Sequence, residues 1–197
     1  MLKVIIFDVG GVYMSGSSVN FINQSYKILG INKKISNSNG ITFDANYNKG
    51  LIDYVDCFKN FFKVPISEEK MKEIVEAWTT TWAPTKEMLD LVKILKKRYV
   101  LAILSNSDLL NSVKYKEQGW YSYFKHLILS HEIGIIKPDK LIYKIALDKI
   151  SAQANECIFI DDQEKVLIPA KKLGMKTILF QSVDQLKKEL KQNGIKF

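Results

Sequence analysis

The sequence predicts an α/β fold, a doubly wound and mostly parallel sheet with an inserted, small all-helical domain. Two observations predict it. From residue 84 onward, short apolar stretches alternate with longer amphipathic stretches, which is typical of repeated βαβ units. Between residues 15 and 83 the pattern is helical, with polar breaks and no convincing strand. We therefore expect residues 1–14 and 84–197 to form the α/β core and residues 15–83 to form a helical cap.

The first predicted strand covers residues 4–7, Val4-Ile5-Ile6-Phe7. Its residues are β-branched or aromatic and uncharged, as in a parallel strand that is buried on both faces. Asp8 then lies at the carboxyl end of the strand, where open α/β sheets place their ligands. Gly10 and Gly11 allow close backbone approaches that a Cβ would block. Taken alone, Asp8 is a metal ligand, a nucleophile or a cap of the following segment.

The insertion and the core each carry a series of further predicted elements. In the insertion, helices are expected over residues 17–29, 46–48, 50–62 and 67–81, with a break rich in Asn, Ser and Gly around residues 32–40. In the core, helices are expected over residues 86–97, 108–118, 138–149, 166–173 and 183–192. The strands between them are expected over residues 99–104, 126–129, 157–160 and 177–180.

Composition narrows the class of protein. With 197 residues, 47% of them apolar, the chain can bury a sizeable core. Cys57 and Cys157 are too few and too far apart to suggest a disulfide framework or a thiolate metal site. Neither a leader peptide nor an apolar stretch of roughly 20 residues is visible. We expect a soluble, cytoplasmic protein without a membrane partner.

The formal net charge of +8 is unevenly distributed. Residues 1–83 hold nine Lys and eight acidic residues, whereas residues 84–197 hold 20 basic and 13 acidic residues. A basic half could attract nucleic acid or an anionic substrate. However, 28 of the 29 cations are Lys, scattered along helix-like stretches. We therefore expect a solvated, Lys-rich surface and no nucleic-acid partner.

Polar residues of a consistent kind follow four of the predicted strands. They are Asp8 after residues 4–7, Ser105-Asn106 after residues 99–104, Lys137-Pro138-Asp139 in the loop beyond residues 126–129, and Asp161-Asp162 after residues 157–160. Each alone has a structural alternative, as a turn, a helix cap or an exposed loop residue. Because the carboxyl ends of parallel strands share one edge of a sheet, we expect the four groups to converge.

The chemistry of this set is coherent. Three carboxylates without a Cys or His partner suit a hard cation such as Mg²⁺. A hydroxyl, an amide and a lysine are the donors that a phosphoryl group needs as its oxygens gather charge. Asp8 could attack phosphorus and form an aspartyl-phosphate, while the metal and Lys137 let two anions approach each other.

These residues resemble the haloacid dehalogenase-like (HAD) hydrolase superfamily over essentially the whole chain. Its four motifs match Phe7-Asp8-Val9-Gly10-Gly11-Val12, Ser105-Asn106, Lys137-Pro138-Asp139 and Asp161-Asp162, and the insertion resembles a small helical (C1) cap on a Rossmann-like core. The resemblance implies that Asp8 is both nucleophile and metal ligand. It also implies that Gly10 offers its carbonyl to Mg²⁺, that Ser105 and Lys137 hold the phosphoryl group and that Asn106 orients the site. Asp162 would be the direct acidic ligand, with Asp161 as a further ligand or its partner.

The sequence departs from the family pattern at two places. Most phosphatases of the superfamily carry a general acid two residues after the nucleophile, where this chain has Gly10. The motif therefore resembles the Asp-x-Gly-[Asn/Gly]-Val subgroup, which includes sugar-phosphate phosphatases such as the bacterial α-glucose-1-phosphate phosphatase. Loss of a general acid slows turnover about 10²–10⁴-fold unless another group replaces it. In addition, Val166 stands where an Asn commonly follows the double Asp.

Three functions are consistent with these residues. The leading hypothesis is a Mg²⁺-dependent phosphatase of a small phosphorylated metabolite, such as a sugar phosphate, acting as a monomer or homodimer. The second is a catalytically weak or inactive domain that binds a ligand or a partner, which Gly10 and Val166 favour. The third is a metal-free 2-haloacid dehalogenase, which Asp161 and Asp162 disfavour because adjacent acids need a cation to offset their repulsion.

Overall fold

A five-stranded parallel sheet forms the centre of the molecule. The structure is a computed structural model that describes residues 2–37 and 43–197. The strands are β1 (Val4–Phe7), β4 (Val100–Ser105), β5 (His126–Leu129), β6 (Cys157–Asp161) and β7 (Lys176–Leu179), in the spatial order β5-β4-β1-β6-β7. All four pairings between them are parallel, so the predicted α/β class is confirmed.

The register of the central strand places the ends of three strands at one edge. Phe7 of β1 lies opposite Ile103 of β4 and Ile160 of β6. Asp8 therefore follows β1 at the edge where Asp161 ends β6. From β1 the chain first adds β4 and β5 on one side of it and later adds β6 and β7 on the other side. β1 therefore lies at a topological switch point of the sheet. Such a switch point leaves an open crevice in which ligands bind.

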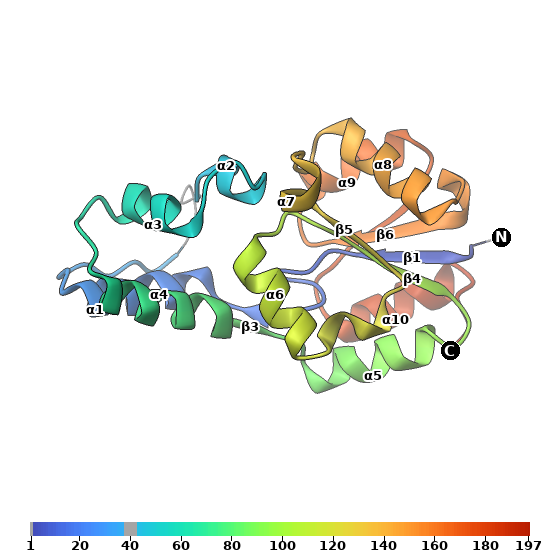
Figure 1. Cartoon of the computed structure of the whole chain (residues 1–197). Helices are drawn as coiled ribbons and strands as arrows, with labels where there is room; N and C mark the ends of the chain where they lie inside the picture. The colour runs from blue at the N-terminus through green and yellow to red at the C-terminus, as the bar shows by residue number, and fades with distance from the viewer. Residues whose placement is uncertain (1, 38–42) are drawn as a thin grey trace.

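Helices cover both faces of the sheet (Figure 1). On one face lie α5 (Lys86–Leu95), α6 (Leu109–Glu117) and α10 (Val183–Gln192), and on the other lie α8 (Lys140–Ile150) and α9 (Glu164–Lys172). Alternation along β1 explains this, because Ile5 and Phe7 point into one apolar cluster and Val4 and Ile6 into the other. The short elements are α7 (Ser130–Ile133), η1 (Trp120–Tyr123) and η2 (Ala154–Glu156).

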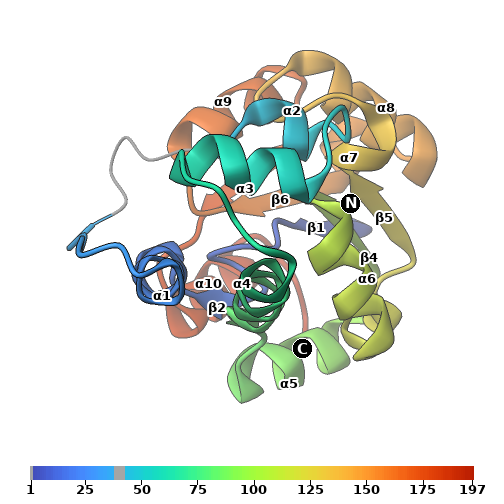
Figure 2. The ribbon, with the colours of Figure 1, turned by 60° about the vertical axis from the view of Figure 1, so that its left-hand side comes forward.

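The segment between β1 and α5 forms a separate helical layer at the left of Figure 1. It contains α1 (Ser18–Leu29), α2 (Ala45–Asn48), α3 (Tyr54–Phe62) and α4 (Glu68–Thr80). Its own aromatic cluster joins Phe21, Phe58 and Trp78. Figure 2 shows α1 and α4 side by side, seen nearly along their axes. This cluster is the physical basis of the predicted helical cap.

The chain enters and leaves the cap through a two-stranded antiparallel sheet, which the sequence did not reveal. It pairs β2 (Ser15–Gly16) with β3 (Trp82–Ala83). These strands lie at the predicted boundaries of the cap, although the division at residues 15 and 83 itself stays a prediction. Two residues carry too little pattern for a strand to be recognised.

Two predicted helices begin at least two residues later in the structure than expected. The helix expected from Gly50 begins at Tyr54, because Asp53 caps it by accepting a hydrogen bond from the Asp56 amide. Similarly, the helix expected from Pro138 begins at Lys140, after the cap Asp139. Part of the break expected around residues 32–40 lies outside the described residues. Among the helices of the described ranges, none has the length and apolar character needed to cross a membrane.

Candidate active site

Asp8, Lys137 and Asp161 form a buried ionic cluster at the carboxyl edge of the sheet. The Lys137 Nζ donates to Asp8 Oδ1 at 2.8 Å and to Asp161 Oδ2 at 2.6 Å. The side chain of Lys137 is 3% exposed, and those of Asp8 and Asp161 are 9% and 0% exposed. The sequence alone allowed Lys137 to be an exposed loop residue. In the structure it is a buried partner of two carboxylates.

Burial and charge compete in this cluster. Burial raises the pKa of Asp8 to about 6, although the Lys137 ammonium opposes the shift. Burial alone would lower the pKa of Lys137, but the charges of Asp8 and Asp161 hold that pKa above its ordinary value. Burial and the neighbouring Asp161 also raise the pKa of Asp162. Carboxylates outnumber the ammonium, so the site has excess negative charge.

The three carboxylates are arranged so that they could hold a metal ion. Asp8, Asp161 and Asp162 each offer one ligand atom, and these atoms lie within 4.8 Å of one another. Asp161 is engaged twice, since its second oxygen accepts the Gln163 amide at 2.9 Å. Asp162 is exposed, whereas Asp8 and Asp161 are buried. All donors are hard oxygens, so the set fits Mg²⁺ better than a softer metal.

Gly11 makes room for the Asp162 carboxylate. Its backbone has φ +82°, and a Cβ built there would lie 2.3 Å from Asp162 Oδ2. Gly10 differs, because apart from its two chain neighbours no described residue has a heavy atom within 4 Å of the position of its Cβ. Its carbonyl oxygen accepts no hydrogen bond from the residues that the structure describes. The side-chain position of residue 10, two residues after Asp8, is thus open space.

Asn106 holds the segment that carries Lys137. Its Nδ2 donates to the Lys137 carbonyl at 3.0 Å, and its Oδ1 accepts the Lys137 amide at 2.7 Å. Ser105 lies at the end of β4 and is 3% exposed. Within the described part of the chain its hydroxyl makes no hydrogen bond, which leaves the hydroxyl available to a ligand. The structure thus brings Asp8, Lys137, Asp161 and Asp162 together, with Ser105 at the same edge and Asn106 on the Lys137 backbone.

A polar network that the sequence did not reveal links the cap to this edge. Tyr47 of α2 donates its hydroxyl to Asp108 Oδ1 at 3.1 Å, and Asp108 also accepts the Asn111 amide at 2.9 Å. Asp108 was recognisable as a helix cap, but a partner 61 positions away leaves no local signal. Nearby, Ser130 Oγ donates to the Asn48 carbonyl.

A second part of this network reaches the loop after β4. The Ser107 hydroxyl is 3.0 Å from His131 Nδ1, and the Ser107 amide donates to Ser130 Oγ at 2.9 Å. Burial lowers the pKa of His131, which favours the neutral ring. The network fixes the backbone next to Ser105 and Asn106. His131 is therefore part of this network through its contact with the Ser107 hydroxyl.

Comparisons with known proteins show which family of sequences and structures this chain matches. The family model of the haloacid dehalogenase-like hydrolases matches residues 2–174. Bifunctional epoxide hydrolase 2 of Sus scrofa is 30% identical over 166 residues, which are 81% of this chain and 26% of that protein. The chain therefore spans about a quarter of the length of that relative. Sesquiterpene phosphatase astK of Aspergillus oryzae is 27% identical over 176 residues, 88% of this chain and 87% of that protein.

A solved structure shares the fold over most of both chains. It is a HAD family enzyme from Bacteroides thetaiotaomicron, a mutant in complex with magnesium and inorganic phosphate. Its TM-score is 0.77 at 22% identity, with 92% of this chain and 95% of that chain covered. At this identity the likeness shows the fold, including the cap on the α/β core.

Proposed function

The chain belongs to the haloacid dehalogenase-like hydrolase family, and from this premise we propose that it is a Mg²⁺-dependent phosphatase of a small phosphorylated metabolite. One observation carries the proposal. A buried carboxylate, Asp8, lies 2.8 Å from the Lys137 ammonium, within a group of three carboxylates that can share a cation. Groups of the kinds needed for a nucleophile, a phosphate-binding cation and a metal-binding set thus lie at one edge of the sheet, which supports the proposal.

The metal would be held by Asp8, Asp162 and the carbonyl of Gly10, with Asp161 beside them. When bound, Mg²⁺ would offset the excess negative charge and bind an oxygen of the phosphoryl group. Asp161 would serve chiefly to position Lys137, because one of its oxygens accepts a hydrogen bond from the Lys137 ammonium at 2.6 Å. Because Gly11 has no side chain, the Asp162 carboxylate would lie close enough to bind the metal.

The chemistry proceeds in two displacements at phosphorus. An Asp8 oxygen forms a bond to phosphorus as the bond from phosphorus to the leaving oxygen breaks, and the leaving oxygen takes a proton from water. A second water then attacks the aspartyl-phosphate, which frees inorganic phosphate and restores the Asp8 carboxylate. Lys137 and the Ser105 hydroxyl bind the phosphoryl oxygens, while Asn106 holds the Lys137 backbone in place.

Water must serve where most relatives use a side chain, because Gly10 has none. Such an enzyme favours substrates whose leaving oxygen is already a weak base. A sugar 1-phosphate has such a leaving group, since the anomeric hydroxyl is more acidic than an ordinary alcohol. Sugar phosphates are therefore the first substrate class to test. The sesquiterpene phosphatase relative adds prenyl-type phosphates to the panel.

Gly10 also favours a second function, a domain that binds a phosphorylated ligand with little or no turnover. The two functions differ in a simple assay. Purified protein is incubated with sugar phosphates, nucleotides and prenyl phosphates, with Mg²⁺ or with EDTA, and released phosphate is measured. We expect Mg²⁺-dependent release that Asp8→Asn abolishes and that Asp184→Asn, at an exposed carboxylate, leaves unchanged.

Two results with the phosphorylated substrates, and one with a 2-haloacid substrate, would contradict the proposal. Release of phosphate by the Asp8→Asn variant at the wild-type rate would show that Asp8 is not the nucleophile. Tight binding of a phosphorylated ligand without any release would favour the binding domain. Activity on a 2-haloacid that survives EDTA would favour the dehalogenase.

A further inference from the structure

A largely apolar pocket lies where the cap meets the core. Its volume is about 520 Å³, and residues from both parts of the chain line it. The cap contributes Tyr47 of α2 with Leu51 and Ile52 of the following connection, and the core contributes Leu109 and Leu110 of α6 with His131 of α7. A pocket of this volume between two domains is typical of a small-molecule site.

Two leucines of this pocket are unusually exposed. Leu51 is 67% exposed and Leu109 is 63% exposed, the highest values among the large apolar side chains of the described residues. They come from different parts of the chain, and yet they line the same pocket. An apolar ligand between them would remove this surface from water, which is favourable by about 25 cal/mol per Å².

The charges around the pocket also favour an uncharged ligand. No lysine or arginine of the described residues lines it, although the chain contains 29 of these cations. Its one carboxylate, Asp53, already caps α3 by accepting the Asp56 amide. Burial lowers the pKa of His131, which favours the neutral ring. The pocket therefore offers little to a charged group.

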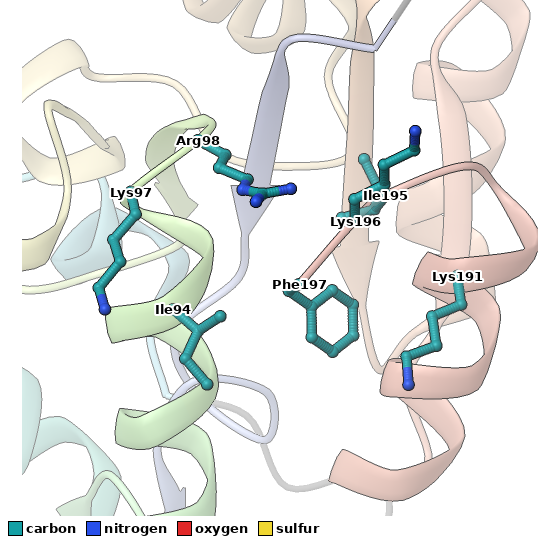
Figure 3. Close-up of a pocket in the computed structure, with 7 residues that line it drawn as sticks. All are labelled: Ile94, Lys97, Arg98, Lys191, Ile195, Lys196 and Phe197. Carbon is teal, nitrogen blue, oxygen red and sulfur yellow. The ribbon is translucent and has the colours of Figure 1, made fainter.

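A hollow at the opposite edge of the sheet has a different character. Arg98, which lies two residues before β4 begins, lines it together with Lys97, Lys191 and Lys196 (Figure 3). Figure 3 shows that the charged ends of these side chains point away from one another. Most of them lie at the carboxyl ends of α5 and α10, where the helix dipole favours cations. They therefore form no common site.

The apolar pocket is connected to the loop that carries Ser105. The first residue of α6 lies four residues after Ser105, so their Cα atoms are at most about 14 Å apart. Within this loop, Asp108 accepts the Tyr47 hydroxyl at 3.1 Å, and the Ser107 hydroxyl lies 3.0 Å from His131 Nδ1. Tyr47 and His131 both line the pocket. A ligand with its phosphoryl group at Ser105 can therefore place its other end near the pocket.

We propose, on the basis of the proposed function, that this pocket holds the leaving group of the substrate and that the substrate is an aryl phosphate. The overall reaction converts the aryl phosphate and water into a phenol and inorganic phosphate. The bond from phosphorus to the ring oxygen breaks as Asp8 attacks, and the aryl oxygen takes its proton from water. The ring lies between Leu51 and Leu109.

Two independent features favour an aryl leaving group. Gly10 supplies no general acid, so the leaving oxygen must be a weak base, and a phenol has a pKa of about 10. The pocket in turn favours an apolar body. A sugar 1-phosphate meets the first condition, but several of its hydroxyls would lose water against the leucines.

Steady-state hydrolysis of phenyl phosphate and 2-naphthyl phosphate with Mg²⁺ tests the pocket. The two leaving oxygens have similar basicity, so the second ring chiefly adds apolar surface. We expect the wild type to have an about tenfold higher kcat/KM for 2-naphthyl phosphate. The double variant Leu51→Asn/Leu109→Asn should lose this preference. Both side chains are exposed, so the substitutions leave the apolar core intact.

The matched control is Leu141→Asn/Ile168→Asn, which replaces two exposed apolar side chains on α8 and α9, outside the pocket. This control should keep the preference for 2-naphthyl phosphate.

Failure of this inference differs from failure of the proposed function. Three results would overturn the aryl pocket while the phosphatase remains: hydrolysis of phenyl phosphate with no preference for 2-naphthyl phosphate, a preference that survives in Leu51→Asn/Leu109→Asn or is equally lost in the control, or a higher kcat/KM for glucose 1-phosphate. Release of no phosphate from any of these three esters would contradict the proposed function itself, and the aryl pocket with it.

Discussion

Gly10 and Gly11, which follow Asp8 closely in the chain, differ in what a side chain would meet. At Gly10 no described residue other than its chain neighbours lies within 4 Å of the position of a Cβ, and the residue does not have a positive φ. At Gly11 the backbone has φ +82° and a Cβ would contact the Asp162 carboxylate. Position 10 can therefore accept a side chain, whereas the absence of a side chain at position 11 determines where the Asp162 carboxylate lies. Each property gives a test.

A carboxylate at position 10 should supply the missing general acid. We expect Gly10→Asp to raise kcat on substrates with a poor leaving group by about 10²–10⁴-fold, because the leaving oxygen then takes its proton from a side chain. Gly10→Ala, which adds only the Cβ, should leave kcat unchanged. A Gly10→Asp variant no faster than Gly10→Ala in steady-state phosphate release would show that proton donation does not limit turnover.

A methyl group at position 11 should weaken the metal site. The Asp162 carboxylate must move away from a Cβ that would otherwise lie 2.3 Å from its oxygen. We expect Gly11→Ala to require at least about tenfold more Mg²⁺ for half-maximal activity, since one ligand is displaced. The Mg²⁺ dependence of phosphate release measures this, with Gly10→Ala as the control. Equal Mg²⁺ requirements would contradict a role of Asp162 as ligand.

At the scale of elements, α2 of the cap is tied to the core beside the site. Figure 2 shows α2 next to α7, and Tyr47 of α2 donates to the buried carboxylate of Asp108, which caps α6. Asp108 lies three residues after Ser105 in the chain. The position of the cap is thereby coupled to the loop that follows β4.

Removal of the Tyr47 hydroxyl should loosen this contact. We expect Tyr47→Phe to lower the free energy of unfolding by about 1–2 kcal/mol, because Asp108 loses one donor but keeps those of Asn111. Tyr54→Phe is the matched control, since within the described residues its hydroxyl makes no hydrogen bond. Chemical denaturation measures both. A Tyr47→Phe variant as stable as the control would show that the hydrogen bond contributes nothing net.

Elements with a clear periodicity could be predicted from the sequence, and elements set by tertiary context could not. The strand over residues 126–129 and the helix over residues 183–192 have the predicted bounds, because each has a strong pattern between polar breaks. In contrast, α7 and the pair of β2 with β3 are too short for a pattern. The start of α3 depends on the Asp53 cap, which the helical pattern over residues 50–62 does not distinguish.

For the site, parallel topology made the convergence of distant residues predictable. Asp8 and Lys137 are 129 positions apart, yet the rule that strand ends share one edge predicts that they converge, and Lys137 Nζ lies 2.8 Å from Asp8 Oδ1. The contact between Tyr47 and Asp108 could not be foreseen, because it depends on how the cap docks. The identity of the substrate depends on the same docking.

At the scale of the whole molecule, charge is separated between the two edges of the sheet. The carboxyl edge carries Asp8, Asp161 and Asp162, while the opposite edge carries the cations around Arg98. The net charge of +8 therefore conceals an acidic centre. A divalent cation at this centre would offset the repulsion among buried carboxylates and so stabilise the fold.

Magnesium should therefore raise the thermal stability of the protein as well as support activity. A ligand that binds only the folded state stabilises it by about 2.7 kcal/mol when its concentration is 100 times its Kd. We expect Mg²⁺ to raise Tm relative to EDTA, and Asp162→Asn to reduce this increase. Thermal unfolding in both buffers measures it, with Asp184→Asn as control. An equal Tm with Mg²⁺ and EDTA would contradict a magnesium site here.

The central claim is that Asp8 is phosphorylated during turnover. The most direct measurement is rapid quenching in acid of the protein with a substrate found in the phosphatase assay, followed by peptide mass spectrometry. The account predicts one added phosphoryl group on the peptide that contains Asp8, formed only with Mg²⁺ and missing in Asp8→Asn. A phosphoryl group found on another residue during turnover, or on the same peptide of Asp8→Asn, would contradict phosphorylation of Asp8.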